Sequence, residues 1–121
     1  TWTAQTSGTS ATLRSAGALA TTLDGTTSYR FVVVGANGSI LSSPDAITWT
    51  AQSANTTAAL NAITSVNQFL VVGANGTILT STDGAIWTPQ TSNSSSDLKT
   101  LLRAENQYLA VNTTGGILFS K

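Results

Sequence analysis

The chain has 121 residues, of which 8% are charged, and its five basic and five acidic residues cancel to a net charge of zero. This balance, with the basic residues scattered, argues against a nucleic-acid partner or an anionic membrane surface. Cys and His are absent, so disulfides and thiolate or imidazole metal sites are excluded, and no cofactor is expected. No apolar run approaches the roughly 20 residues of a membrane-spanning helix.

A motif centred on Trp opens the chain and returns twice. It reads Thr1-Trp-Thr-Ala-Gln-Thr-Ser7, then Thr48-Trp-Thr-Ala-Gln-Ser-Ala54, then Ile86-Trp-Thr-Pro-Gln-Thr-Ser92, at offsets of 47 and 38 residues. The nine extra residues of the first interval lie between Gly8 and Tyr29. We expect them to form a longer loop at or near Ser15–Gly17.

A second motif also recurs along the chain. Phe31–Ser43 and Phe69–Ser81 agree at ten of thirteen positions, and Tyr108–Ser120 is a decayed third copy, at offsets of 38 and 39 residues. Self-similarity at a fixed period is the signature of a repeat architecture, and it decides the fold class here.

Each repeat predicts four short strands. Consecutive apolar residues indicate strands covered on both faces, and Asn37-Gly38 and Asn75-Gly76 favour type I′ hairpin turns, with Thr114-Gly115 a weaker version. Local propensity favours a helix over residues 97–105, but the repeat register predicts a strand there. The predicted strands, in their order within the repeat, are Ala18–Leu23, Leu60–Ser65 and Leu98–Arg103; Tyr29–Val34, Gln68–Val72 and Gln107–Val111; Ser39–Ser43, Thr77–Ser81 and Gly116–Ser120; Ile47–Ala51 and Ile86–Thr88.

A period of about 38 residues with four strands and a Trp near its end is typical of a β-propeller blade. We predict an all-β chain forming one repeat domain over residues 1–121, with units at about 8–51, 52–89 and 90–121 plus the strand 1–6. A β-sandwich is the alternative. The fidelity of the repeat favours blades.

The stretch Val71–Trp87 resembles the blades of bacterial BNR-like, or Asp-box-like, propellers, a style of repeat also found in the photosystem II assembly factor family. The Asp box of the BNR-like propellers is Ser-x-Asp-x-Gly-x-x-Trp. Ser81, Asp83 and Trp87 match it in kind, with Gly84 one place early and Trp87 one place short. Ser43, Asp45 and Trp49 match in the same way, with Ala46 where the second unit has Gly84. The resemblance implies a structural role, in which the Asp accepts hydrogen bonds from turn amides and the Trp packs between sheets.

The N-terminal segment reads as the fourth strand of a blade, and the third unit lacks one. We therefore expect Thr1, Trp2, Thr3, Ala4 and Gln5 of one copy to complete the last blade of another copy. Propellers usually have about four to eight blades. Two copies would close a six-bladed ring, and a rotation that does not close would build a filament.

Candidate sites are few. The titratable residues do not converge in the repeat pattern, so we expect no enzyme activity. The recurring Trp residues could stack on sugars, but blade packing is favoured. Asn55, Asn93 and Asn112 stand in Asn-x-Ser/Thr sequences and are candidate glycosylation sites.

Three classes of function remain open. The first is a structural or adhesive module that self-assembles, secreted or at the cell surface as the neutral composition rich in Thr, Ser and Asn suggests. The second is a lectin-like ring that binds carbohydrate. The third is a scaffold that binds another protein, as the resemblance to assembly factors suggests.

Overall fold

The structure, a computed structural model, describes residues 1–65, 67–105 and 107–120, so Val66, Asn106 and Lys121 lie outside the description. Within these ranges the chain folds into antiparallel sheets that follow one another along the chain, and its two short 3₁₀ turns are η1 (Ala36–Gly38) and η2 (Ala74–Gly76). The all-β prediction is confirmed. No helix in these ranges is long and apolar enough to cross a membrane.

Each sheet is a simple meander. The first sheet has the order β1 (Leu13–Leu23), β2 (Thr26–Gly35), β3 (Ile40–Ser43) and β4 (Thr50–Gln52). The second sheet repeats this order with β5 (Leu60–Ser65), β6 (Phe69–Gly73), β7 (Ile78–Ser81) and β8 (Thr88–Gln90). The third sheet has the three strands β9 (Leu98–Ala104), β10 (Gln107–Asn112) and β11 (Ile117–Ser120).

The Asn-Gly turns have the expected backbone. Asn37 and Gly38 have φ of 58° and 70°, and the Ser39 N–H donates to the Ala36 carbonyl at 3.1 Å across the turn. Asn75 and Gly76 repeat this geometry with φ of 57° and 71°. Positive φ at both central residues is the requirement of a type I′ turn, which matches the twist of the flanking strands.

The nine extra residues of the first unit do not form a loop at Ser15–Gly17, and that prediction is wrong. Ser15–Gly17 lies inside β1, and the extra residues lengthen the β1–β2 hairpin, which turns at Asp24 and Gly25 with φ of 52° and 79°. The physical reason is local. The segment is rich in Thr and Leu, and its Asp-Gly pair supplies the two positive φ angles of a tight hairpin turn.

The fourth strands begin later than predicted. Ile47–Ala51 and Ile86–Thr88 were the expected ranges, whereas β4 starts at Thr50 and β8 at Thr88. Trp49 and Trp87 therefore precede the strands. The cause is the preceding turn, which uses the residues after Ser43 and Ser81 for its own hydrogen bonds.

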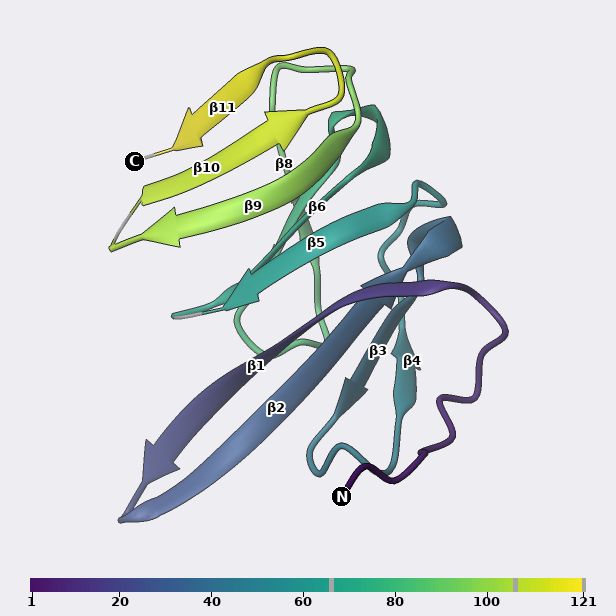
Figure 1. Cartoon of the computed structure of the whole chain (residues 1–121). Coiled ribbons are helices and arrows are strands. Elements are labelled where there is room, and N and C mark those ends of the chain that lie inside the picture. Colours follow the sequence, from purple (N-terminus) through teal and green to yellow (C-terminus); the bar gives the residue numbers. More distant parts are fainter. Residues whose placement is uncertain (66, 106, 121) are drawn as a thin grey trace.

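The sheets stack face to face in an arc. The first strands β1, β5 and β9 lie side by side along one edge of the stack, and the two ends of the chain lie at opposite ends of it (Figure 1). Hydrogen bonds link these three strands. The Ile63 N–H of β5 donates to Ser15 Oγ of β1 at 3.2 Å, and Asn61 Nδ2 of β5 donates to the Leu98 carbonyl of β9 at 2.8 Å.

The core lies between the sheets. We call the face of a sheet that is turned toward the preceding sheet its front face and the opposite face its rear face. The rear face of the first sheet packs on the front face of the second, and the residues of this cluster include Val32, Val34, Ile40, Phe69, Val71, Leu79 and Trp87. A smaller cluster between the second and third sheets contains Val72, Leu98 and Ala110.

Candidate functional site

The predicted turn motif forms a closed set of hydrogen bonds in the second sheet. Ser81 Oγ donates to Asp83 Oδ1 at 3.0 Å and accepts the Gly84 N–H at 2.8 Å. Asp83 Oδ1 also accepts the N–H groups of Ala85 and Ile86, at 2.9 and 3.0 Å. A short carboxylate followed by a turn satisfies local amides in this way.

The first sheet has the same turn. Ser43 Oγ donates to Asp45 Oδ1 at 2.9 Å, and that oxygen accepts the N–H groups of Ile47 and Thr48, both at 2.9 Å. Ala46 takes the place of Gly84 and keeps a left-handed φ of 63°, where Gly84 has 77°. The turn therefore forms without glycine at this position, at the cost of a backbone conformation that L residues disfavour.

These bonds lower the pKa of both carboxyl groups. For Asp45 the main cause is the N–H of Thr48, followed by that of Ile47 and the Ser43 hydroxyl. For Asp83 the pKa is lowered chiefly by the N–H of Ile86 and then by that of Ala85. Hydrogen bonds to a carboxylate favour its charged form, so both groups stay ionised and hold their turns.

The three recurring Trp residues have different surroundings. Trp87 is 4% exposed, its Nε1 donates to the Gly84 carbonyl at 3.2 Å, and its ring lies 6.0 Å from that of Phe69. Trp49 is half-buried, and Trp2 is fully exposed. Trp87 packs between the first and second sheets, so its ring is not available to stack on a sugar.

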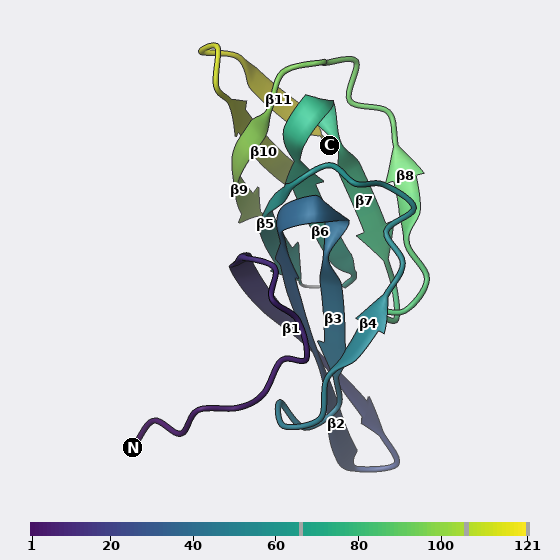
Figure 2. The ribbon, with the colours of Figure 1, turned by 90° about the vertical axis from the view of Figure 1, so that its right-hand side faces the viewer.

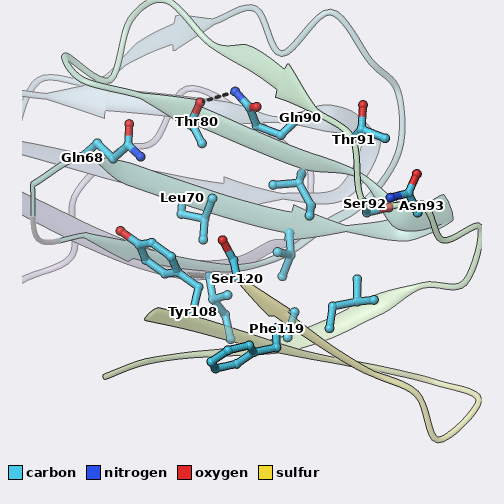
Figure 3. Close-up of a pocket in the computed structure, with 15 residues that line it drawn as sticks. Gln68, Leu70, Thr80, Gln90, Thr91, Ser92, Asn93, Tyr108, Phe119 and Ser120 are labelled. Carbon is cyan, nitrogen blue, oxygen red and sulfur yellow. Dashed lines mark hydrogen bonds between the residues drawn. The ribbon is translucent and has the colours of Figure 1, made fainter. Parts of the chain in front are cut away.

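A groove opens between the second and third sheets (Figure 3). Its volume is about 680 Å³, within the range of small-molecule pockets. Leu70 and Tyr108 face it from the two sheets, with the amides of Gln68, Gln90 and Asn93 around it (Figure 3). Gln90 is held in place because its Nε2 donates to Thr80 Oγ1 at 3.0 Å.

Sequence reasoning did not single out the groove. The apolar residues that line the groove look like ordinary strand residues in the sequence. Only comparison with the residues 38 or 39 positions earlier, in the preceding repeat, shows that these positions face a neighbouring sheet. The repeat therefore contains the pattern of groove-lining positions. This pattern can be recognised only once it is known which faces of the sheets pack together.

The residues predicted to exchange between copies are unpaired. Thr1–Gln5 is exposed throughout and forms no strand, and the segment extends away from the sheets (Figure 2). Among the described residues β11 pairs only with β10, so its other edge is open. An open edge presents backbone N–H and C=O groups to any added strand.

Two of the three candidate glycosylation sites are exposed. Asn55 and Asn93 lie in the linkers between sheets with left-handed φ of 56° and 58°. Asn112 is half-buried, and its Oδ1 accepts the N–H groups of Thr114 and Gly116 at 3.0 and 2.6 Å. The side chain of Asn112 is therefore engaged in its own turn.

Three stacked meanders of one repeat are the arrangement of propeller blades. The family model described as DUF6242 beta propeller domain matches residues 1–121. The chain belongs to this family. Neither the search of the curated proteins nor the search of the solved structures returned a match.

As a member of the DUF6242 beta propeller family, the chain has sheets that are blades, and the sandwich alternative is set aside. Each blade runs from its inner strand β1, β5 or β9 outward. The groove of Figure 3 is then a space between two blades, and the open edge of β11 is the outer edge of a blade.

Proposed function

We propose that this propeller domain is a non-catalytic, self-assembling module that acts as a structural or adhesive scaffold outside the cell or at its surface. The observation that supports self-assembly is the exposed apolar rear face of the third blade. Three large apolar side chains stand exposed there, Leu102 at 61%, Ile117 at 65% and Phe119 at 57%.

The same positions are covered in the first blade. Ile40, the counterpart of Ile117, is 1% exposed, and Ser42, the counterpart of Phe119, is also 1% exposed. Both lie on the rear face of the first blade, which the second blade covers. The rear face of the first blade is thus buried by its neighbour, which supports a docking role for the exposed apolar rear face of the third blade.

The matching surface is the front face of the first blade. Phe31, Val33 and Trp49 are only half-buried there, whereas their second-blade counterparts Phe69, Val71 and Trp87 are buried against the first blade. A second copy that places this face on the rear face of the third blade repeats the contact already present between the first two blades. Each large apolar side chain that becomes fully buried contributes about 1.5–3 kcal/mol.

The test is the mass of the chain in solution, measured by size exclusion with light scattering over a concentration series. We expect association of the natural chain and a shift toward the monomer in the double variant Ile117→Thr and Phe119→Thr. Both replacements suit an exposed strand, so the fold is retained.

The matched control is Leu23→Thr, because Leu23 is 67% exposed at the tip of the β1–β2 hairpin, away from both blade faces. The control should associate as the natural chain does. A natural chain that stays monomeric at every concentration, or a double variant that associates unchanged, would contradict the proposal.

Carbohydrate binding is the second candidate function. It is favoured by the lining of the groove, which includes the Tyr108 ring and the amides of Gln68, Gln90 and Asn93. A small-molecule site commonly combines aromatic and apolar walls with a few polar groups, and a sugar can use both. Titration with neutral oligosaccharides, followed by NMR shifts, should perturb the groove residues and lose the effect in Tyr108→Ala. Unchanged spectra at millimolar sugar would remove this candidate.

A further inference from the structure

The groove between the second and third blades is lined by the counterparts of residues that pack together between the first and second blades. Its rear-face side is formed by Leu70, Val72 and Ile78, whose counterparts in the first blade are Val32, Val34 and Ile40. Its front-face side is formed by Leu101, Tyr108 and Leu118, whose counterparts in the second blade are Ile63, Phe69 and Leu79. The two interfaces therefore correspond position by position.

One side chain distinguishes them. Between the first and second blades, Trp87 is buried among these residues, with its ring beside Phe69. The part of the third blade that the structure describes supplies no Trp at the matching place, and the groove stands open there (Figure 3). A buried Trp side chain covers about 150–250 Å² of surface, so an indole ring suits the space between these two blades.

The N-terminal segment has the sequence of an outer strand and the Trp that precedes it. Trp2-Thr3-Ala4-Gln5 is identical to Trp49-Thr50-Ala51-Gln52, which leads into and forms the outer strand β4. Its spacing to the following inner strand is also the same, since Gln5 precedes Leu13 by as many residues as Gln52 precedes Leu60.

The residues after this segment are already folded as a linker between blades. The Ala11 N–H donates to Thr9 Oγ1 at 3.1 Å, as the Ala58 N–H donates to Thr56 Oγ1 at 3.1 Å. The Thr12 carbonyl accepts the Ala36 N–H at 2.8 Å, as the Ala59 carbonyl accepts the Ala74 N–H at 2.8 Å. Residues 6–12 thus hold the path of a chain that arrives from the outer strand of a preceding blade.

A glycine marks where that linker would lie on the third blade. Added side-chain atoms at Gly38 and Gly76 would collide with the linker carbonyls of Thr56 and Ser94. Gly115, at the matching turn of the third blade, has nothing within 4 Å of such an atom. Thr9 is the counterpart of Thr56, so the linker of an incoming copy would occupy this space with its Thr9.

From these correspondences we infer that Trp2 of a second copy is the anchor of the assembly, seated in the groove between the second and third blades, with Thr3–Gln5 added as the outer strand beside β11. The inference rests on the proposed self-assembly and names its site. A copy cannot seat its own Trp2, because the N-terminus lies at the opposite end of the arc from the third blade (Figure 1).

The register follows from the second blade. There Ile78 pairs with Gln90 and Thr80 with Thr88. The same pairing sets Ile117 of one copy opposite Gln5 of the other and Phe119 opposite Thr3. Residues directly opposite in an antiparallel pair have Cα atoms about 4.5–5.5 Å apart, which suits a disulfide, whereas diagonal neighbours lie about 7–8 Å apart.

Two measurements test the inference. The first is the dissociation constant of the assembly for Trp2→Ala, which should rise at least about thirtyfold, the size expected for a buried aromatic anchor. The exposed apolar residue Leu23 is the control, and Leu23→Ala should leave the constant unchanged.

The second measurement is cross-linking, and the chain has no Cys that could interfere. The pair Thr3→Cys and Phe119→Cys should form an intermolecular disulfide under mild oxidation. The pair Gln5→Cys and Phe119→Cys, two residues out of register, should form it more slowly.

The outcomes separate this inference from the proposed function. Association that is unchanged in Trp2→Ala, or faster cross-linking of the out-of-register pair, would overturn the anchor while leaving self-assembly in place. A natural chain that remains monomeric at all concentrations would overturn both.

Discussion

At the scale of single residues, the Ser-x-Asp turn is held by one carboxylate oxygen. Asp83 Oδ1 accepts three donors, namely the Ser81 hydroxyl and the N–H groups of Ala85 and Ile86. These bonds position the chain just before Trp87, so the local turn and the packing of the indole ring are coupled.

The lowered pKa of Asp83 makes this turn sensitive to acid. The folded-state pKa lies below that of the unfolded chain, about 3.9, so the carboxylate stabilises the fold at neutral pH and loses this effect as the pH falls through the folded-state value. We expect Asp83→Asn to be less stable than the natural chain at neutral pH, with the difference shrinking below about pH 4.

Urea unfolding between pH 2 and 7, at constant protein concentration, measures this difference in the free energy of unfolding. Asp24→Asn, in the exposed turn of the β1–β2 hairpin, is the control for replacing an Asp in a turn outside the Ser-x-Asp motif. Parallel profiles for Asp83→Asn and the natural chain would show that the Asp83 charge does not stabilise the turn.

At the scale of elements, the second strand of each of the first two blades ends close to the linker that enters the same blade. β6 ends at Gly73, and a Cβ atom there would collide with the carbonyl of Ala59 in the linker that enters the second blade. Glycine is needed at this position because of the close approach, since its φ of −161° is extended backbone that any residue adopts.

We expect Gly73→Ala to lower the free energy of unfolding by about 1–3 kcal/mol, the usual cost of overpacking. Gly17→Ala is the control, because an added Cβ there meets its nearest neighbour, Ser65 Oγ, at an ordinary 3.4 Å. Urea denaturation of both variants provides the comparison. Equal stabilities would mean that the linker shifts freely at Ala59.

At the scale of the whole molecule, the arc has two unlike ends. One end presents the rear face of the third blade and the open edge of β11, and the other presents the front face of the first blade and the free segment Thr1–Gln5. If copies associate through these ends as proposed, the contacts are head to tail, so they would close into a ring or continue as a filament.

The mass measurement of the proposed function also distinguishes these assemblies. A dimer would be a six-bladed ring in which both grooves and both open edges are filled. A mass that keeps growing with concentration would indicate a filament, because the rotation between copies then fails to close.

Much of the fold could be predicted from the sequence, because its signals are local. Runs of apolar residues mark the strands, and Asn37-Gly38 and Asn75-Gly76 mark turns whose positive φ angles the structure confirms. The loop expected at Ser15–Gly17 was wrong because the extra residues extend a hairpin that turns at Asp24 and Gly25, so that β1 and β2 lengthen together.

The sequence by itself determined the repeat, the order of strands in each blade and the Ser-x-Asp turns, since all of these depend on neighbours in the chain. Only the tertiary structure decided which copies of a motif are buried. Trp87 is 4% exposed, Trp49 is half-buried and Trp2 is fully exposed, although their local sequences are nearly the same. Burial depends on whether another blade face lies against the ring, and that neighbour is distant in the sequence or belongs to another copy.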